Sequence, residues 1–350
     1  MSTDKCRLLV TGGAGFIGSN FVRFVLSQKP NWHVVNYDAL TYAGNLASLE
    51  DLKSNPRYSF VHADIRNRED MLSALKGCDC VVHFAAESHV DRSIMDSGPF
   101  ISTNVQGTQV LLDACRACNI KRLVHVGTDE VYGDLPLDRP DLLFTETTPI
   151  RPSSPYSASK ASSDLLALAY HHTFKMPVMV TRCSNNFGPY QFPEKVIPLF
   201  VTNLIDGLKV PLYGDGRNVR DWLHVLDHCE AVLTVLERGE AGEVYNIGGN
   251  NERSNLELTK MLLKLMGKGD EMIQPVVDRL GHDRRYAIDA SKIKRTLGWQ
   301  PTRSAWPDAL MNTVLWYKSN EAWWRPLKNK QLNHTPAHQQ QKHAAPAAAH

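Results

Sequence analysis

Short apolar runs alternate, from Arg7 to Arg182, with longer stretches in which apolar residues recur at helical spacing. The β-branched runs predict strands at Leu8–Thr11, Val34–Tyr37, Tyr58–His62, Cys80–Phe84, Arg122–Val126 and Val178–Arg182. The longer stretches predict helices at Phe16–Leu26, Asp70–Leu75, Ile101–Cys118 and Ser157–Thr173. Such alternation is typical of an α/β fold, so we expect a doubly wound parallel sheet with helices on both faces.

Proline and glycine punctuate the sequence that follows, as in Gly188-Pro189, Phe192-Pro193 and Gly214-Asp215-Gly216. Irregular segments of this kind build substrate pockets. Helical spacing at Asp227–Leu236 and a strand-like run at Val244–Ile247 then predict a return to the sheet. We therefore expect a sheet domain at 1–182, rejoined by 222–248, and a smaller interleaved C-terminal lobe that binds substrate, mainly within 183–325.

The last part of the chain, 326–350, is rich in Ala, Gln, His and Pro and shows no period. This composition predicts a disordered tail. Its histidines could bind a metal weakly, but their irregular spacing favours a flexible terminus; they are His334, His338, His343 and His350.

Composition and charge exclude several classes of protein. The 350 residues carry 39 Lys and Arg against 37 Asp and Glu, a balance that calls for neither nucleic acid nor a membrane surface. We find no secretory signal pattern and no apolar run near the ~20 residues that a spanning helix needs. Seven cysteines then indicate the reduced thiols of a cytoplasmic protein. Cys78/Cys80 and Cys115/Cys118 resemble metal pairs, but no partner pairs stand nearby at zinc spacing, so no metal is expected.

A glycine-rich segment, Gly12-Gly13-Ala14-Gly15-Phe16-Ile17-Gly18, follows the first predicted strand and opens the first predicted helix. Its glycines allow a tight turn and let a pyrophosphate approach the helix N-terminus. Asp38 ends the second strand, twenty residues beyond Gly18, where a carboxylate hydrogen-bonds the ribose of a dinucleotide. Because a carboxylate repels a 2′-phosphate, the pattern predicts a Rossmann-type site for NAD rather than NADP. A turn beside a surface Asp is the weaker alternative.

Tyr156-Ser157-Ala158-Ser159-Lys160 places a phenol and an ammonium on one face of a predicted helix. The ammonium favours the phenolate and should pull the pKa of Tyr156 toward the working pH. Tyr156 is therefore a candidate base for a hydroxyl proton.

Two adjacent carboxyls, Asp129 and Glu130, follow the predicted strand Arg122–Val126. Ligands of open α/β sheets bind beyond the carboxyl ends of strands, so both should face the pocket rather than form a solvated acidic turn. Neighbouring carboxyls whose surroundings separate their pKa values can serve as an acid and a base. An elimination of water needs such a pair.

These motifs together resemble the extended short-chain dehydrogenase/reductase family. Within that family, Thr128-Asp129-Glu130 is similar to the motif of nucleotide-sugar 4,6-dehydratases. The likeness to the dTDP-glucose 4,6-dehydratases extends from about Arg7 to about Tyr317 and includes the runs Asp38–Asn45, Phe84–Arg92, Cys183–Pro198, Gly214–Leu223 and Asp278–Asp283.

The resemblance implies two sets of binding residues. NAD would be held by Gly12, Gly15, Phe16, Ile17, Gly18, Asp38, Ala39, Leu40, Thr41, Asp64, Ile65, Phe84, Ala85, Ala86, Glu87, Ser88, Thr103, Tyr156, Lys160 and Asn186. The sugar nucleotide would be held by Ser88, Thr128, Asn185, Glu194, Lys195, Val196, Pro211, Leu212, Tyr213, Arg220, Asn255, Asp278, Arg279, Leu280, Gly281 and His282. Lys195, Arg220 and Arg279 suit a diphosphate, although each alone would be read as a surface charge.

The activity implied is that of an NAD-dependent lyase acting on dTDP-glucose or, alternatively, UDP-glucose. Tyr156 would take the O4 proton during C4 oxidation, assisted by Lys160 and Thr128. Glu130 would then remove the C5 proton, Asp129 would protonate the departing O6, and hydride would return to C6, so NAD would stay bound. The family also implies a homodimer through the helices at Ile101–Cys118 and Ser157–Thr173, unless both apolar stripes face their own sheet.

Three positions depart from the family pattern: Ala39 stands for a frequent Lys, His224 for a Tyr and Leu280 for a Pro. We expect a lost cofactor contact at Ala39 and an altered nucleotide-pocket rim at the other two. An epimerase or decarboxylase of the same family is the nearest alternative, but such relatives usually lack the adjacent carboxyl pair that Asp129 forms with Glu130. A non-catalytic NAD-binding regulator is a further alternative. Such a protein would have no chemical need for the intact set of catalytic residues.

Overall fold

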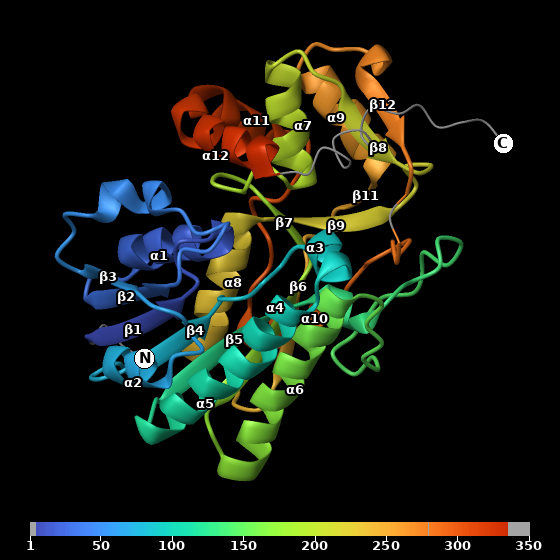
Figure 1. Ribbon diagram of the computed structural model, residues 1–350. Coiled ribbons are helices and arrows are strands. Elements are labelled where there is room, and N and C mark those ends of the chain that lie inside the picture. The colour runs from blue at the N-terminus through green and yellow to red at the C-terminus, as the bar shows by residue number, and fades with distance from the viewer. Residues whose placement is uncertain (1–4, 279, 335–350) are drawn as a thin grey trace.

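A computed structural model of the chain describes residues 5–278 and 280–334. Within these residues, parallel strands form a seven-stranded sheet in the order β10-β6-β5-β4-β1-β2-β3 (Figure 1). The strands are β1 (Cys6–Thr11), β2 (Trp32–Asp38), β3 (Tyr58–His62), β4 (Cys80–His83), β5 (Arg122–Thr128), β6 (Val178–Cys183) and β10 (Val244–Ile247). The strand order reverses between β1 and β4, which creates the crevice where open α/β sheets bind ligands.

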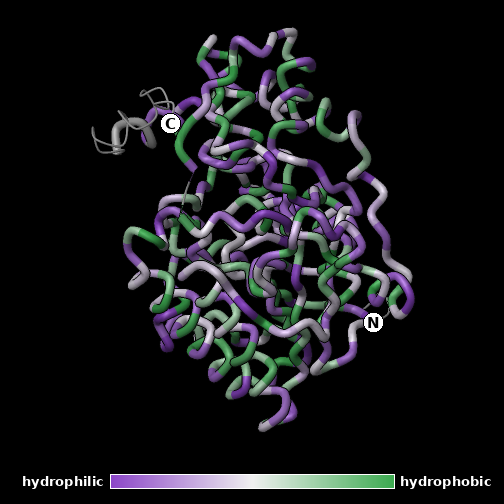
Figure 2. The backbone as a smooth tube through the Cα atoms, turned by 90° about the vertical axis from the view of Figure 1, so that its right-hand side faces the viewer, coloured by the Kyte–Doolittle hydropathy of each residue, from purple (hydrophilic) through white to green (hydrophobic). Residues whose placement is uncertain are grey.

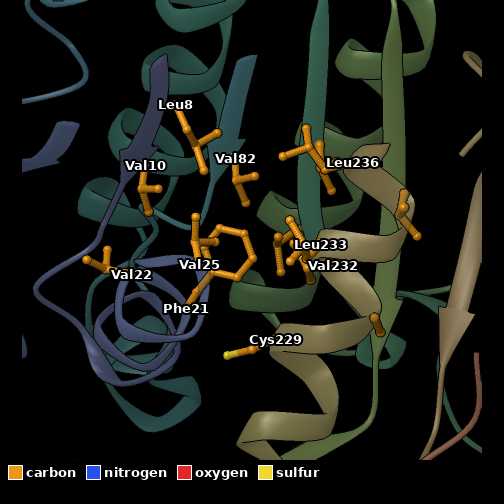
Figure 3. Packing of buried hydrophobic residues seen from close by; sticks show 14 of the residues in the cluster. Leu8, Val10, Phe21, Val22, Val25, Val82, Cys229, Val232, Leu233 and Leu236 are labelled. Atoms are coloured by element: carbon orange, nitrogen blue, oxygen red, sulfur yellow. The ribbon is translucent and has the colours of Figure 1, made fainter. Parts of the chain in front are cut away.

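Helices cover both faces of the sheet, which confirms the doubly wound fold. One face carries α1 (Phe16–Gln28) and α8 (Val225–Arg238), and the other carries α2 (Arg68–Ala74), α5 (Thr108–Ala117) and α6 (Pro155–Phe174). Successive residues of a strand point to opposite faces, so Leu8 packs toward α1 and α8 while Leu9 packs toward α5. Figure 3 shows Phe21 of α1 and Leu233 of α8 meeting over Leu8 and Val82. Each such fully buried side chain contributes about 1.5–3 kcal/mol.

Several element boundaries differ from the sequence prediction. The helix expected at Ile101–Cys118 begins as a π-helix, η2 (Ile101–Gly107), before α5. The helix expected from Ser157 begins two residues earlier, because Ser154 caps it by accepting a hydrogen bond from the Ser157 N–H and Pro155 suits the first turn. The strand expected to end at Val126 continues as β5 to Thr128.

A smaller lobe lies above the sheet in Figures 1 and 2. It contains β7 (Asn185–Phe187), β8 (Val210–Tyr213), β9 (Val219–His224), β11 (Glu252–Ser254), β12 (Ile273–Val276), α7 (Val196–Ile205), α9 (Asn255–Leu265), α11 (Asp308–Ser319) and α12 (Glu321–His334). Its apolar core is centred on Phe187, Phe200, Leu262, Tyr317 and Trp324.

The chain passes between the sheet and this lobe more than once. After β6 it enters the lobe through β7, α7, β8 and β9, and it then returns to the sheet as α8 and β10. It re-enters the lobe with β11 and α9, and α10 (Ser291–Leu297) packs back against β10.

The shorter elements are η1 (Leu46–Leu52), α3 (Val90–Met95), α4 (Gly98–Phe100), η3 (Asp129–Tyr132) and η4 (Asp270–Met272). No helix in the described ranges has the length and apolar character needed to cross a membrane.

The prediction of disorder from residue 326 is wrong for its first part, because α12 continues to His334. Trp324 is fully buried, and Lys328 forms a 2.8 Å ion pair with Asp206. The Lys-, Asn- and Gln-rich composition gave no sign of the buried Lys328 side chain, nor of the anchoring contacts of Trp323 and Trp324 just before residue 326. Residues 335–350, with His338, His343 and His350, lie outside the described residues.

Candidate active site

A cleft of about 400 Å³ opens at the carboxyl ends of β1, β2, β4 and β5, within the range of small-molecule sites. Most of the predicted site residues line it together: Gly12, Gly15, Phe16, Ile17, Gly18, Asp38, Ala39, Thr41, Asp64, Ile65, Phe84, Ala85, Ala86, Glu87, Ser88, Thr103, Thr128, Asp129, Glu130, Tyr156, Lys160, Asn185, Asn186, Glu194 and Lys195. Residues from both parts of the sequence therefore converge on one cavity.

The glycine turn between β1 and α1 has no room for a side chain at Gly12 or Gly18. Gly12 has φ +70°, and a Cβ atom on it would lie 2.6 Å from the backbone nitrogen of Ala85. A Cβ on Gly18 would lie 2.2 Å from the carbonyl oxygen of Gly12. Gly15 caps α1 without a side-chain hydrogen bond. The first turn of α1 can therefore approach a phosphate closely, which is what a dinucleotide requires.

Asp38, at the end of β2, joins two loops of the cleft. Its Oδ2 accepts a hydrogen bond from the Ala14 N–H at 2.9 Å, and its Oδ1 accepts one from the Leu40 N–H at 2.8 Å. Burial raises the pKa of Asp38, while these two hydrogen bonds oppose the rise. The carboxylate lines the cleft, where its remaining lone pairs can accept a ribose hydroxyl. Leu40 lies beside the cleft rather than on its wall.

Tyr156 and Lys160 occupy the first two turns of α6. The Tyr156 backbone N–H donates to Ser93 Oγ on α3 at 3.1 Å, and Lys160 Nζ donates to the Val126 carbonyl oxygen at 2.7 Å. Burial raises the pKa of Tyr156 well above its ordinary value, and the charge of Glu130 raises it further. Burial also lowers the pKa of Lys160. The expected lowering of the Tyr156 pKa is therefore wrong, because burial and the charge of Glu130 raise this pKa.

Asp129 and Glu130 begin η3 directly after β5. Asp129 is 2% exposed, and burial together with repulsion from Glu130 and Asp221 raises its pKa well above the ordinary value. The Glu130 N–H donates to Thr128 Oγ1 at 3.3 Å, which turns this segment into the cleft. The surroundings therefore favour a protonated carboxyl at Asp129 beside the second carboxyl of Glu130.

The remaining predicted substrate residues do not line this cleft. They lie in the smaller lobe or its connections: Val196, Pro211, Leu212, Tyr213, Arg220, Asn255, Asp278, Leu280, Gly281 and His282. The rings of Tyr213 and His282 are 6.4 Å apart, and His282 Nδ1 lies 2.6 Å from Asp278 Oδ1. Arg279 lies outside the described residues.

Arg220 connects this second group with the first. Its guanidinium lies 4.2 Å from the centre of the Tyr286 ring and donates to the Asp283 carbonyl oxygen at 2.9 Å. Its charge lowers the pKa of Asp129, against the dominant effect of burial. His224 was expected at the pocket rim, but it is buried and packs on Phe187. It caps α8, because its imidazole Nδ1 accepts a hydrogen bond from the Leu226 N–H.

Sequence reasoning missed several cleft residues, including Tyr42, Arg66, Gln191 and Phe192. The Arg92 guanidinium lies 3.8 Å from the centre of the Tyr42 ring, and Phe192 meets the same ring edge-on at 5.8 Å. Tyr42 lies within the run Asp38–Asn45. An aromatic residue so close in sequence to Asp38, the carboxylate expected to bind the ribose, was therefore an available signal. Phe192 lies in the Pro-punctuated segment that the sequence marks as pocket-forming, but its contact with Tyr42 arises only through the tertiary fold.

Comparisons with known proteins point to nucleotide-sugar enzymes. The family model described as GDP-mannose 4,6 dehydratase matches residues 9–306. A dTDP-glucose 4,6-dehydratase from Actinoplanes sp. is 54% identical over 323 residues, 91% of this chain and 99% of that protein. A solved dTDP-glucose 4,6-dehydratase from Streptomyces venezuelae, with NAD bound, is 53% identical with a TM-score of 0.89, covering 92% and 99% of the two chains.

A UDP-glucose 4-epimerase from Thermotoga maritima shares the fold at lower identity, 28%, with a TM-score of 0.81 and coverage of 89% and 99%. The chain is thus more similar to these dehydratases than to this epimerase.

Proposed function

Because the chain belongs to the GDP-mannose 4,6 dehydratase family of nucleotide-sugar enzymes, we propose that it dehydrates dTDP-glucose to the 4-keto-6-deoxy sugar with bound NAD. The observation that carries this proposal is the buried Asp129 beside Glu130 in the same cleft as Tyr156 and Lys160. This arrangement supplies groups for oxidation and for elimination within one cavity.

The residues of the cleft fit NAD. The side-chain-free turn at Gly12 and Gly18 would hold the pyrophosphate, and Asp38 would hold the ribose. When bound, NAD would supply a reversible hydride acceptor for C4 and hydride donor for C6 of the hexose, so it need not leave between turnovers.

For the oxidation, we assign Tyr156 as the group that takes the O4 proton. Burial raises the pKa of this phenol, so its ionisation requires a nearby cation. Lys160 lies one helical turn further on the same face of α6. Thr128 lines the cleft beside Asp129 and can bond the same substrate hydroxyl.

For the elimination, we assign Glu130 as the base that removes the C5 proton and Asp129 as the acid that protonates O6. Asp129 suits the acid role because burial keeps its proton bound. The epimerase alternative needs neither residue, since epimerisation at C4 breaks no bond at C5 or C6.

We assign the nucleotide to the smaller lobe, with Lys195 and Arg220 as partners of the diphosphate. A thymine and a uracil differ by one methyl group, worth only ~1–3 kcal/mol in a pocket. We favour dTDP because the relatives with half of their residues identical carry that name.

The test separates the two stages. Tyr156→Phe should form no NADH when dTDP-glucose is added, whereas Asp129→Asn/Glu130→Gln should oxidise C4 and then stall. Proton transfer contributes on the order of 10²–10⁴ in rate, so near-ultraviolet absorbance of NADH should accumulate and deuterium exchange at C5 should fall. Product is followed by mass, with UDP-glucose in parallel. If the double variant made the 4-keto product at the parent rate, the assignment would fail.

We also propose a homodimer built on α5 and α6. Exposed apolar side chains lie in this region: Ile101 of η2, which leads into α5, is 50% exposed, and Leu165 and Phe174 of α6 are 55% and 45% exposed. Replacing Leu165 with Glu should convert the dimer to a monomer in sedimentation velocity at micromolar concentration. A monomeric parent protein would refute the dimer.

All seven cysteines are free thiols. Free thiols persist in a reducing compartment, so we propose a cytoplasmic location, which fractionation of the native cells would test.

A further inference from the structure

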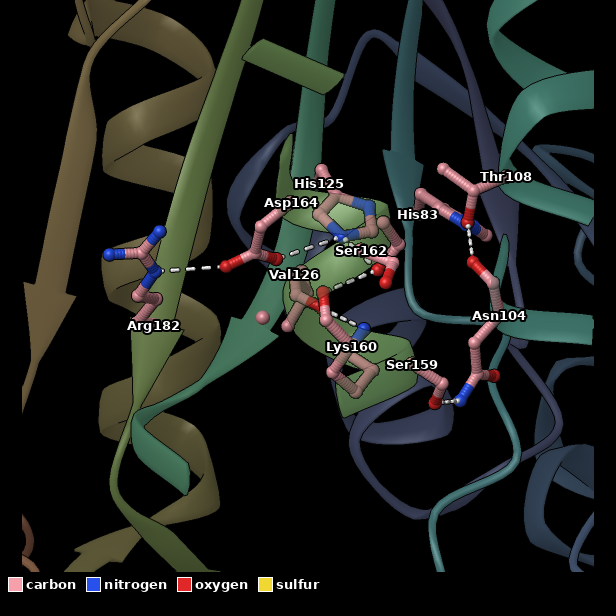
Figure 4. Close-up of polar contacts among 12 residues, drawn as sticks. His83, Asn104, Thr108, His125, Val126, Ser159, Lys160, Ser162, Asp164 and Arg182 are labelled. Atoms are coloured by element: carbon pink, nitrogen blue, oxygen red, sulfur yellow. Dashed lines mark hydrogen bonds and ion pairs between the residues drawn. The ribbon is translucent and has the colours of Figure 1, made fainter. Parts of the chain in front are cut away.

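A buried carboxylate, Asp164, stands one helical turn beyond Lys160 on α6. It is 0% exposed. Its Oδ2 accepts a hydrogen bond from Arg182 Nε at 2.9 Å, and its Oδ1 lies 3.2 Å from His125 Nε2 (Figure 4). Arg182 is also buried, on β6. Removing one member of such a buried pair leaves an uncompensated charge, so the two residues depend on each other.

Arg182 continues the contact from α6 to η3. Its second nitrogen donates to the Tyr132 hydroxyl at 3.0 Å, and its guanidinium lies 4.9 Å from the centre of the Tyr132 ring. The Tyr132 hydroxyl in turn donates to Asn246 Oδ1 on β10 at 2.7 Å. Tyr132 is the last residue of η3, the turn that begins with Asp129. A continuous path thus runs from α6 through β6 to η3.

We propose that Asp164 and Arg182 are positioning residues, a buried ion pair that holds the helix of Tyr156 and Lys160 and the turn of Asp129 and Glu130 in one fixed arrangement. The inference rests on the proposed function, because it assigns oxidation to α6 and elimination to η3. It adds that one buried ion pair positions the residues of both stages.

Asp164 of this pair also affects the pKa of Lys160. The titratable groups that face Lys160 from the surrounding elements are Asp164 on α6, His125 on β5, Cys183 on β6 and His83 on β4. Burial lowers the pKa of both histidines and raises the pKa of the Cys183 thiol to about 12, so these three groups are neutral. Arg182 faces Asp164 from its other side. Asp164 therefore supplies the negative charge that raises the pKa of Lys160 against burial.

The first arm of the test is Asp164→Asn, which keeps the shape and removes the charge. With Asp164 neutral, the pKa of Lys160 falls, so Lys160 loses its proton at lower pH than in the parent. The rate of NADH formation, measured in the Asp129→Asn/Glu130→Gln background, should lose its high-pH activity at a lower pH. We expect the rate constant for NADH formation at saturating substrate to fall on the order of 10²-fold, as for a misplaced catalytic group, with the half-saturating substrate concentration little changed. Asp164→Glu should restore the parent profile in part.

The second arm is Tyr132→Phe in the otherwise unchanged enzyme, which removes one hydroxyl and keeps the ring. This variant should slow elimination and leave oxidation intact, so NADH should accumulate on the enzyme. A general loss of stability would slow both stages together and accumulate nothing. Tyr132→Phe also keeps the inference testable if Asp164→Asn does not fold.

The matched control is Asp227→Asn. Asp227 is a fully buried carboxylate on α8, on the other face of the sheet, paired with Arg303 at 3.0 Å. It should lower stability without moving the pH profile. If the parent enzyme makes product and Asp164→Asn keeps the parent profile, or Tyr132→Phe accumulates no NADH, the positioning role is refuted. A parent protein that makes no product refutes the proposed function instead.

Discussion

Replacing Asp129 with Asn should make the protein more stable at neutral pH while slowing its elimination step. In the folded protein the pKa of Asp129 is raised, chiefly by burial, well above the ordinary value of 3.8. The folded state therefore binds a proton that the unfolded state has lost, and stability falls as pH rises from the ordinary value toward the folded pKa. Asn cannot ionise, so the variant escapes this loss.

The magnitude follows from linkage. Between the ordinary pKa of Asp and the pKa of Asp129 in the folded protein, the free energy of unfolding of the variant should rise by about 1.4 kcal/mol relative to the parent for every pH unit. Asp129 Oδ2 is buried without a hydrogen-bond partner, so the new amide adds a pH-independent cost of about 1–3 kcal/mol. The diagnostic quantity is therefore the change with pH in the difference between the two free energies of unfolding, rather than the size of that difference at one pH.

The assay is urea unfolding at pH 5, 6, 7 and 8 with saturating NAD. Asp138→Asn, at an exposed carboxyl on a loop, is the control for the change from a carboxyl to an amide. A difference between Asp129→Asn and the parent that stays constant from pH 5 to 7 would refute the assignment of a buried, protonated Asp129, and with it the acid role.

Three further outcomes are expected. The purified protein should carry NAD and turn over without added cofactor; consumption of one external NAD per product would contradict this. Gly18→Ala should lose bound NAD, measured as nucleotide released on denaturation, because the new Cβ would lie 2.2 Å from the Gly12 carbonyl oxygen, whereas Ser27→Ala on the exposed side of α1 should retain it. Trp324→Ala should lower the free energy of unfolding by about 3–5 kcal/mol; an unchanged value would mean that α12 does not anchor the smaller lobe.

Features encoded locally were predictable from the sequence. The strand, glycine turn and helix around Gly12 are adjacent in the chain. Asp38 ends the next strand, so the lengths of the helix and of that strand set its position relative to the turn. Tyr156 and Lys160 are neighbours by helical spacing alone. For these residues, a short-range pattern determines which side chains meet.

Features that depend on long-range packing were not predictable. The stack of Arg92 on Tyr42 joins residues fifty positions apart through the fold of α3. The pKa of Tyr156 was predicted in the wrong direction, because helical spacing reveals Lys160 but neither the burial nor the charge of Glu130 that raises this pKa. The path from Asp164 to Tyr132 likewise requires β5 and β6 to be neighbours, which no motif states.

The edge strand β10 has a consequence for how the protein is made. It pairs with β6, yet it is translated only after α7, β8 and β9 of the smaller lobe have been synthesised. Until Ile247 has left the ribosome, β6 presents an unpaired and apolar edge, which is a template for aggregation. A fragment that ends after Cys183 would keep that edge uncovered. We therefore expect a fragment that contains the cofactor half alone to aggregate more readily than the full chain.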